Sequence, residues 1–383
     1  MYSFKRMNIE HTKGRLLVTS DIHGHIEHLK AVLQKARFDG DDLLLIVGDM
    51  LDKGPKSLET LRYVMKLCAE GRALVTMGNV DYLRLTSIKY TIDNPENAQN
   101  FLDYINYMNE WKGTCFYKEL FNEIGIEPSS TEAITENIVA VWEHFKEEFD
   151  FIKSLPTLAE SEKYIFVHGG IPHDESELQS ECKDAMKYLK SDAFRDSALR
   201  KGFRFDRQVV CGHWPVLNYG ERLCCSPLFD SATRTISIDG GCGLVREGQL
   251  NLLIFPSVDC EVEDIEYIWY DGFPTVTALQ EQEESKDAFS ISWPENEVTL
   301  ISLKGDVAEV EHNATGKRLL ITADALWKDP STLKNGDVSR IRQSTDFKLS
   351  VNVDDTLSVI CKTSAGLLAK KNGVVGWYFG KYE

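Results

Sequence analysis

The chain has 383 residues, of which 43% are apolar and 27% charged, and its formal net charge is −17. This composition excludes a disordered or fibrous protein, and the acidic balance argues against a nucleic acid or an anionic membrane as the main partner, because both attract clustered lysine and arginine. The N-terminus lacks an apolar signal core, no CxxC pair occurs, and no segment approaches ~18 uninterrupted apolar residues. We therefore expect a reduced, cytoplasmic chain without a membrane span.

Several short apolar runs have the length and composition of strands that are buried on both faces. They are residues 15–21, 42–49, 72–79, 163–170, 207–213, 235–241 and 249–256. Amphipathic stretches at 25–36 and 57–71 separate the first three runs, and this alternation predicts βαβ units with a largely parallel sheet. The later runs follow one another more closely, which indicates a second, mixed sheet.

Residues 83–160 lie between two predicted core strands and have a different pattern. Apolar residues recur there at helical intervals among many acidic residues. We expect a helical insert over about 83–160, and inserts of this kind often cover or shape a site.

The composition changes again towards the C-terminus. An acidic stretch at 276–289 predicts a linker after a main α/β domain over 1–275. From 290 to 383, short alternating runs with turn signals, including Lys-Asn-Gly at 371–373, predict a small β domain.

The predicted core strands end in side chains that can bind a cation. In chain order these are Asp21 with His23, Asp49, Asn79, His168, His213 and Asp239. In parallel α/β sheets, ligands collect at the carboxyl ends of strands, so these side chains can converge although they are far apart in the sequence. Asp, Asn and His suit divalent ions such as Mn²⁺, Fe²⁺ or Zn²⁺, and a bridging carboxylate would hold two such ions about 3.5–4 Å apart.

The motifs that carry these residues resemble those of the calcineurin-like metallophosphoesterases. They are SDIHGH (20–25), GDMLDKG (48–54), GNVD (78–81), VHGG (167–170) and GHWP (212–215). The likeness is greatest to the serine/threonine phosphoprotein phosphatases and their bacterial and phage relatives, and IDGGCG (238–243) resembles a late strand of the bacterial members. The resemblance covers residues 15 to 256 and implies an α/β fold, a two-sheet metallophosphoesterase sandwich flanked by helices.

The resemblance also implies a role for each matching residue. The first divalent ion would take Asp21, His23 and Asp49, and the second would take Asp49, Asn79, His168 and His213. A hydroxide that bridges the two ions would attack phosphorus in line, without a phosphoenzyme. Mn²⁺ is the ion we expect first, with Fe²⁺, Zn²⁺ and Ni²⁺ as alternatives.

One residue departs from the family pattern, in which positions 78–81 would read Gly-Asn-His-Glu. Val80 replaces the histidine, which pairs in the family with the position of Asp52 and protonates the leaving oxygen. General acid catalysis is worth roughly 10²–10⁴-fold. Three explanations stay open: His25, His173 or water supplies the proton, the leaving group needs little protonation, or the site binds without catalysis.

Asp52, Lys53 and Arg195 are the further candidate catalytic residues. Lys53 stands where the family carries a phosphate-binding arginine, and Arg195 resembles an arginine segment of the bacterial members. Two interpretations of Asp52 stay open: a hydrogen bond to a metal-bound water or ligand, and a carboxylate at a helix N-terminus.

Residues 317–383 resemble a bacterial SH3-type barrel, chiefly through the Lys-Asn-Gly turn and a late Gly-Trp-Tyr. Trp327, Trp377 and Tyr378 either line a groove for a peptide partner or belong to the core.

The resemblance to the calcineurin-like metallophosphoesterases implies a dinuclear-metal-dependent phosphoester hydrolase. Its substrate would be a phosphorylated protein or a small phosphoester, and a serine/threonine-type phosphoprotein phosphatase is the leading prediction. A symmetrical dinucleoside polyphosphate hydrolase is the alternative enzyme. The alternative of another class is a catalytically weak phospho-ligand sensor, because Val80 replaces the general acid.

Overall fold

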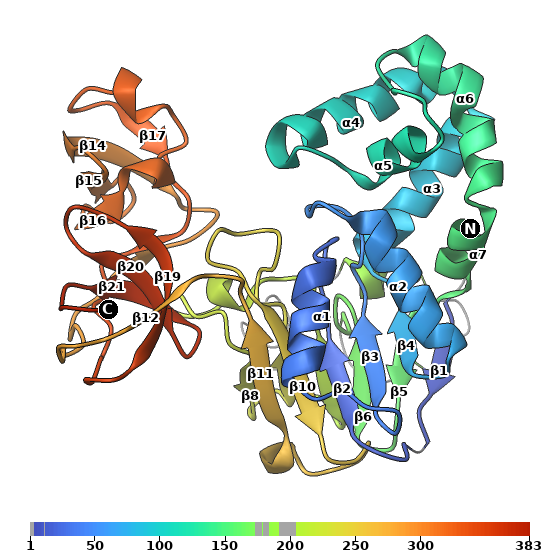
Figure 1. Cartoon of the computed structure of the whole chain (residues 1–383), viewed down its shortest axis with the longest axis horizontal. Coiled ribbons are helices and arrows are strands. Elements are labelled where there is room, and N and C mark those ends of the chain that lie inside the picture. Colours follow the sequence, from blue (N-terminus) through green and yellow to red (C-terminus); the bar gives the residue numbers. More distant parts are fainter. Residues whose placement is uncertain (1–3, 11, 173–177, 179–183, 191–203) are drawn as a thin grey trace. The chain divides into compact units, whose positions relative to one another are not determined.

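The computed structural model describes residues 4–10, 12–172, 178, 184–190 and 204–383 (Figure 1). The chain forms two compact units, and each is built from segments that are not contiguous in the sequence. The first unit comprises Met1–Trp214, Pro227–Leu244 and Gln249–Tyr270, and the second comprises Pro215–Ser226, Val245–Gly248 and Asp271–Glu383.

A five-stranded sheet in the first unit has the order β11-β10-β2-β3-β4. Its strands are β2 (Leu16–Thr19), β3 (Leu43–Val47), β4 (Ala73–Thr76), β10 (Leu250–Phe255) and β11 (Glu266–Tyr270). Strands β2, β3 and β4 are parallel, as the strand–helix alternation predicts, and β10 joins β2 antiparallel. The predicted parallel core is therefore confirmed.

A six-stranded mixed sheet has the order β1-β5-β6-β7-β9-β8. Its strands are β1 (Arg6–Asn8), β5 (Leu158–Glu160), β6 (Tyr164–Val167), β7 (Gln208–Cys211), β8 (Leu228–Asp230) and β9 (Thr235–Ser237). Apolar side chains of β2 and β3, among them Val18 and Val47, share one buried cluster with Phe166 of β6 and Val210 of β7. The two sheets therefore pack face to face, and each predicted apolar run contains a strand.

Helices cover the other face of the five-stranded sheet and continue beyond its edge. The elements α1 (Ile26–Lys35) and α2 (Ser57–Ala69) share a buried cluster with Leu17, Leu44 and Ile46 of that sheet. The insert contains α3 (Asn79–Asp93), α4 (Ala98–Lys112), α5 (Phe116–Glu123), α6 (Thr131–His144) and α7 (Lys146–Ser154). Figure 1 shows α3 to α6 on the side towards which β2, β3 and β4 point. A short α8 (Met186–Leu189) follows β6.

The helical insert differs from its predicted bounds of 83–160 at both ends. Helix α3 already begins at Asn79, because Gly78 is extended and the Asp81 side chain accepts a hydrogen bond from its N–H. At the other end, Leu158–Glu160 forms β5 of the six-stranded sheet rather than helix.

The second unit is rich in β-structure, as predicted. One sheet has the order β12-β19-β20-β21 and another the order β16-β15-β14-β17, with a separate β13-β18 pair. The strands are β12 (Thr275–Thr277), β13 (Ser290–Ile291), β14 (Glu297–Lys304), β15 (Val307–His312), β16 (Arg318–Thr322), β17 (Val338–Arg340), β18 (Ser344–Thr345), β19 (Thr356–Lys362), β20 (Leu367–Lys371) and β21 (Val374–Tyr378). The SH3-type barrel stays a prediction.

The structure divides the chain differently from the predicted domains 1–275 and 290–383 and the linker 276–289. Ala278 is fully buried, and the N–H of Gln282 donates to the carbonyl of Val351 at 2.8 Å, so residues 276–289 are built into the second unit. The segment after His213 also belongs to this unit, because Leu217, Leu223 and Cys225 share a buried cluster with Val375 and Trp377.

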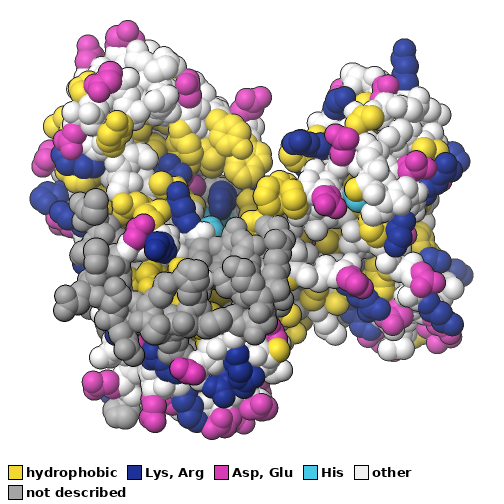
Figure 2. Space-filling view, turned by 180° about the vertical axis from the view of Figure 1, so that it is seen from behind, with side chains coloured by type: hydrophobic (Ala, Val, Ile, Leu, Met, Phe, Trp, Pro, Cys, Tyr) yellow, Lys and Arg dark blue, Asp and Glu magenta, His cyan; other side chains and the backbone are white. Residues whose placement is uncertain are grey.

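The aromatic residues that we considered for a peptide groove do not share one environment. Trp377 and Tyr378 are fully buried and belong to the core, whereas Trp327 is 59% exposed. On the described surface seen in Figure 2, basic side chains are interspersed with acidic ones. Within the described ranges, no helix has both the length and the apolar composition needed to cross a bilayer.

Candidate metal site

The predicted ligands converge at the carboxyl ends of strands from both sheets. Asp21 follows β2, Asp49 follows β3, and Asn79 opens α3 just after β4, while His168 directly follows β6 and His213 lies shortly after β7. Asp21, Asp49 and His168 are buried, and they can each offer a ligand atom within 4.8 Å of the others. The expected convergence is therefore present in the fold.

The distances divide these side chains into two groups around Asp49. On one side, Nε2 of His23 lies 3.7 Å from Oδ1 of Asp21 and 3.7 Å from Oδ2 of Asp49. On the other side, Nε2 of His168 lies 3.4 Å from Oδ1 of Asp49 and 2.9 Å from Oδ1 of Asn79. Nδ1 of His213 lies 2.8 Å from the same Asn79 oxygen. The Asp49 carboxylate thus presents one oxygen to each group, which is the geometry of a bridging ligand.

The backbone at this site is strained. Residues other than glycine have left-handed φ angles between 49° and 70° at Asp21, His23, Asp49, Asp52, Lys53 and His213. Such a conformation costs on the order of 1–3 kcal/mol per residue and persists where the surrounding structure enforces it. Here the N–H of Asp21 donates to the carbonyl of Gly48 at 3.1 Å, and the N–H of His23 donates to that of Asp49 at 3.0 Å.

Two glycines leave room for the carboxylates. A Cβ atom on Gly78 would lie 2.2 Å from Oδ1 of Asp49, and one on Gly212 would lie 2.2 Å from Oδ2 of Asp21. Any side chain at either position would displace a candidate ligand.

The histidines are oriented by backbone carbonyl groups. Nδ1 of His23 lies 3.0 Å from the carbonyl oxygen of Leu51, and Nδ1 of His168 lies 2.9 Å from that of Val47. Because a carbonyl only accepts, each Nδ1 carries a proton and donates, so Nε2 is the ring nitrogen that faces the carboxylates and would bind an ion.

The electrostatics of the site call for positive charge. Burial raises the pKa of Asp21 and lowers that of His23 to about 3. Burial acts to lower the pKa of His168 as well, but the Asp49 and Asp21 carboxylates outweigh it and raise this pKa to about 10. In the chain alone, a proton on His168 balances the buried carboxylates. The donor set therefore fits a pair of divalent cations, which would supply that charge.

Lys53 lies in the site, whereas Asp52 points away from it. Nζ of Lys53 is 3.0 Å from Nε2 of His23. Oδ2 of Asp52 lies 2.5 Å from Nε of Arg84 and accepts a hydrogen bond from the Tyr104 hydroxyl at 2.6 Å. Its Oδ1 accepts from the N–H of Phe116 at 2.7 Å. Asp52 therefore joins the loop after β3 to the helical insert, which neither interpretation from the sequence anticipated.

Two residues near the site, Arg84 and Asp81, have structural roles that the sequence analysis did not assign. Arg84 lies one helical turn after Val80 in α3, and this spacing is the signal that would have paired it with the Asp52 position. The Asp81 carboxylate accepts from the N–H groups of Met50 and Leu51 at 3.0 and 3.3 Å and so fixes the loop that follows Asp49.

The remaining candidates take different places. The N–H of Val80 donates to Oδ1 of Asp49 at 2.8 Å, so the backbone of Val80 serves the site although its side chain cannot. Asp239 is buried, and its Oδ1 accepts from the N–H of Gly241 at 2.7 Å. Arg195 and His173 lie outside the described residues.

Comparison with known proteins adds an independent finding. Residues 14–245 match the family model described as calcineurin-like phosphoesterase. A symmetrical bis(5'-nucleosyl)-tetraphosphatase of Psychromonas ingrahamii is 37% identical over 90 residues, which are 23% of this chain and 32% of that protein. The enzyme of the same name from Aliivibrio fischeri is 24% identical over 255 residues, which are 58% of this chain and 89% of that protein.

Among solved structures, a protein serine/threonine phosphatase from Saccharomyces cerevisiae matches 70% of this chain and 84% of its own. The TM-score is 0.40 and the sequence identity is 12%. Nearly all of the second unit, from residue 246 onward, lies outside the family match.

Proposed function

The chain belongs to the calcineurin-like phosphoesterase family, and from this premise we propose that it is a divalent-metal-dependent phosphoric ester hydrolase. We assign Asp21, His23 and Asp49 to one ion, and Asp49, Asn79, His168 and His213 to the other. When bound, such ions supply Lewis acid chemistry: they lower the pKa of water and neutralise charge on the phosphoryl group. We propose Mn²⁺ for both ions. Three of the six proposed ligands, Asp21, Asp49 and Asn79, bind through carboxylate or amide oxygens, which suit Mn²⁺.

The side chains around the ions orient the site and bind the substrate. The carbonyl groups of Leu51 and Val47 fix the rings of His23 and His168, and the N–H of Val80 holds the Asp49 carboxylate. We propose that the ammonium of Lys53, which is already at the His23 ring, binds a phosphoryl oxygen as a point charge.

The environment of Val80 is the single observation that favours one kind of substrate. The valine side chain cannot donate a proton, and the Asp52 carboxylate that would orient a histidine there is engaged by Arg84 and Tyr104. An arginine does not release its proton in a protein, so Arg84 cannot replace the missing acid. A weakly basic leaving group, such as a nucleotide phosphate or a phenol, needs no such acid. We therefore propose that phosphoanhydrides and aryl phosphates are the preferred substrates.

A dinucleoside polyphosphate is the phosphoanhydride that we favour. The matched sequence relatives are named as symmetrical tetraphosphatases of such compounds. In addition, a pocket of about 480 Å³ lies beside the partners of Asp52, and Arg84, Tyr90, Tyr104 and Tyr117 are among its lining residues. Aromatic rings of this kind stack on nucleobases. We propose that one nucleoside binds there.

A phosphoprotein is the second candidate substrate. The observation in its favour is the second unit, which extends the chain beyond the family match and carries exposed aromatic side chains such as Trp293 and Trp327. Under this proposal the second unit would bind the protein substrate.

Initial rates on four substrates with Mn²⁺ test these proposals. We expect diadenosine tetraphosphate and p-nitrophenyl phosphate to be hydrolysed at least about a hundredfold faster than glycerol phosphate, because only the last needs a general acid. A phosphoserine peptide distinguishes the second candidate, and faster turnover of the peptide than of the dinucleotide would overturn the first. The Asp49→Asn variant controls for a contaminating phosphatase. If the protein binds these substrates but hydrolyses none of them, both proposed enzyme activities are wrong, and a catalytically weak phospho-ligand sensor is the remaining interpretation.

Tyr90→Ala tests the nucleoside pocket by itself. We expect a higher KM for diadenosine tetraphosphate and an unchanged KM for p-nitrophenyl phosphate, which has no nucleoside. Tyr107→Ala is the matched control, because Tyr107 is exposed to a similar degree and does not line the pocket. Equal KM values for the dinucleotide in the two variants would exclude this pocket.

A further inference from the structure

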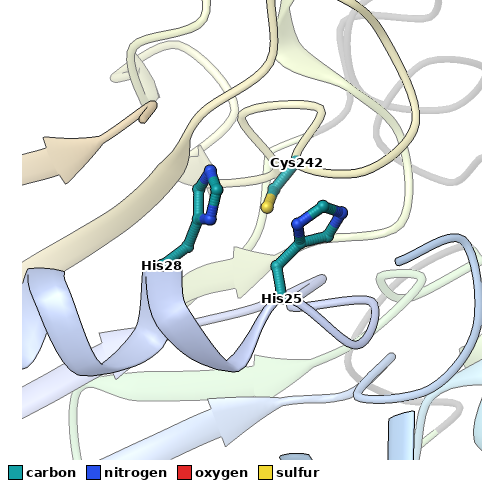
Figure 3. A group of neighbouring side chains, drawn as sticks. All are labelled: His25, His28 and Cys242. Atoms are coloured by element: carbon teal, nitrogen blue, oxygen red, sulfur yellow. The ribbon is translucent and has the colours of Figure 1, made fainter. Parts of the chain in front are cut away.

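A second cluster of metal-binding side chains lies outside the predicted ligand set. It consists of His25, His28 and Cys242, each of which can offer a ligand atom within 4.8 Å of the other two (Figure 3). We propose that this His25–His28–Cys242 cluster binds a third metal ion, a transition-metal ion of the Zn²⁺ class.

The fold brings the three side chains together from two distant segments. His25 is the N-cap of α1 and His28 lies in its first turn, so their spacing of three residues puts both rings on one side of the helix. The ring centroids are 5.0 Å apart with an interplanar angle of 72°. Cys242 comes from the loop after β9, and Figure 3 shows its sulfur pointing into the space between the two rings.

His25 turns one of its two ring nitrogens towards the cluster. Figure 3 shows Nδ1 of His25 facing the Cys242 sulfur, whereas Nε2 lies on the far side of the ring, 2.8 Å from where a Cβ atom on Gly54 or Gly243 would lie. Nε2 is buried and makes no hydrogen bond to the described residues. A neutral imidazole with its proton on Nε2 has its lone pair on Nδ1, where a metal ion in the cluster would bind.

The ligand types of the His25–His28–Cys242 cluster favour a different ion from the one that suits the neighbouring site. A thiolate with two imidazoles favours Zn²⁺ or Co²⁺, whereas the carboxylates and amide of the first site suit Mn²⁺. Three protein ligands leave a fourth tetrahedral position for water. With metal–ligand bonds of about 2.0–2.3 Å, a tetrahedral ion holds its ligand atoms about 3.3–3.8 Å apart, so the cluster needs to close by about 1 Å.

An ion in this cluster would act on the loop that follows Cys242. A Cβ atom on Gly243 would lie 2.8 Å from Nε2 of His25 and 3.2 Å from Cβ of His23, so this loop runs directly against both histidines. The ion would join the loop after β9 to the start of α1 and thereby limit the movement of His23. This consequence rests on the proposed role of His23, whereas binding of the ion does not.

Titration with Co²⁺ of the full chain, already saturated with Mn²⁺, tests the proposal. A thiolate bound to Co²⁺ gives an intense near-ultraviolet charge-transfer absorption. The ligand set of the first site contains no cysteine, so this absorption reports the His25–His28–Cys242 cluster and not the first site. It also requires no turnover, so a failure of the proposed phosphatase activity would leave the readout intact.

We expect the charge-transfer band in the wild type and in the control Cys68→Ser, which removes a partly buried thiol from α2. Cys242→Ser should abolish the band, and His28→Gln should weaken Co²⁺ binding at least about tenfold. A wild type without the band, or a Cys242→Ser variant that retains it, would overturn the proposal. If Cys242→Ser does not fold, an unchanged affinity in His28→Gln overturns it equally.

Discussion

Nε of Arg84 lies 2.5 Å from Oδ2 of Asp52, and both side chains are almost completely buried. The Tyr104 hydroxyl donates to the same oxygen, and the guanidinium of Arg84 lies 4.0 Å from the centre of the Tyr104 ring. This pair connects the loop after β3 with α3 and α4. In the family, the carboxylate at the Asp52 position pairs with the acid histidine. In this chain, Asp52 instead attaches the helical insert to the loop after β3.

Replacing Arg84 with methionine should destabilise the first unit strongly. The substitution leaves the Asp52 carboxylate buried without its cation, and breaking a buried pair in this way costs about 3–5 kcal/mol. Urea unfolding followed by helical circular dichroism measures the effect, because the described α-helices all lie in the first unit. Lys89→Met is the control, since it breaks an exposed pair with Asp93 on the same helix. Similar losses in both variants would contradict the prediction.

Restoring a histidine at position 80 should not by itself restore acid catalysis. In Val80→His the new imidazole would find Asp52 already paired with Arg84, whereas Val80→His/Arg84→Leu removes this cation and leaves only the hydrogen bonds from Tyr104 and Phe116. We expect the double variant to hydrolyse glycerol phosphate at least about tenfold faster than Val80→His, with little change for p-nitrophenyl phosphate. Steady-state kcat values below the melting temperature of each variant provide the measurement. An equal gain on both substrates would show that the added group does not protonate the leaving oxygen.

Adding one methyl group at Gly78 should disrupt the proposed bridging ligand. The Cβ of Gly78→Ala would lie 2.1 Å from the backbone nitrogen of Asp49 and 2.2 Å from its Oδ1, so the carboxylate must move. We expect fewer Mn²⁺ ions per chain by elemental analysis and a rate reduced on the order of a hundredfold. Gly40→Ala provides the comparison, because nothing lies within 4 Å of its Cβ. Unchanged Mn²⁺ content in Gly78→Ala would exclude Asp49 as a bridge.

Glu119 should make the stability of the first unit depend on pH. Burial raises the pKa of Glu119 from 4.5 to about 7, although its carboxylate accepts hydrogen bonds from the N–H groups of Ser57 and Leu58. Because the folded chain holds this proton more tightly than the unfolded chain, its stabilisation is complete below pH 4.5 and is lost as the pH rises to about 7. Between pH 4.5 and about 7, we expect the free energy of unfolding of the wild type to fall by up to about 3 kcal/mol relative to that of Glu119→Gln.

Parallel unfolding curves at the two ends of that range give the measurement. A difference between wild type and Glu119→Gln that does not vary with pH, or that grows in the opposite direction, would mean that the two backbone hydrogen bonds outweigh the burial of the carboxylate.

Deleting residues 271–383 should weaken metal binding in the first unit. The segment Pro215–Ser226 begins two residues after His213 and belongs to the second unit, so the deletion removes the apolar partners of Leu217 and Leu223. We expect lower Mn²⁺ content and slower hydrolysis of p-nitrophenyl phosphate. Trp327→Ala changes an exposed side chain of the same unit and should leave both unchanged. A truncated chain with full Mn²⁺ content would show that the segment holds its conformation alone.

The sequence was sufficient to predict the parallel strands and the place where their ends meet. Strands buried on both faces leave continuous apolar runs, and the ligand candidates follow those runs directly. The start of α3 at Asn79 was missed because Gly78 and Asn79 read as the end of a strand, while the capping carboxylate of Asp81 is recognised only in the folded turn.

Contacts between segments that are distant in the sequence could not be predicted from the sequence. The partnership of Arg84 with Asp52 depends on how a helix packs against a loop, and the charge of an arginine gives no sign of its partner. In the same way, nothing in the run from Pro215 to Ser226 shows that it packs with Trp377, which lies more than a hundred residues later. A division of the chain by composition therefore assigned this segment to the main α/β domain, whereas the structure groups it with the second unit.

The left-handed backbone at Asp21, His23, Asp49 and His213 constrains how this family member can evolve. Glycine would relax each of these positions but would remove the side chain that we propose as a metal ligand, and most other side chains would be held in the same unfavourable conformation. Val80 lies instead within a regular helix, where exchanging one side chain does not disturb the main chain. Mutational drift can therefore change the side chain at position 80 while these four residues persist, and a search for thermostable variants would do best to leave their loops untouched.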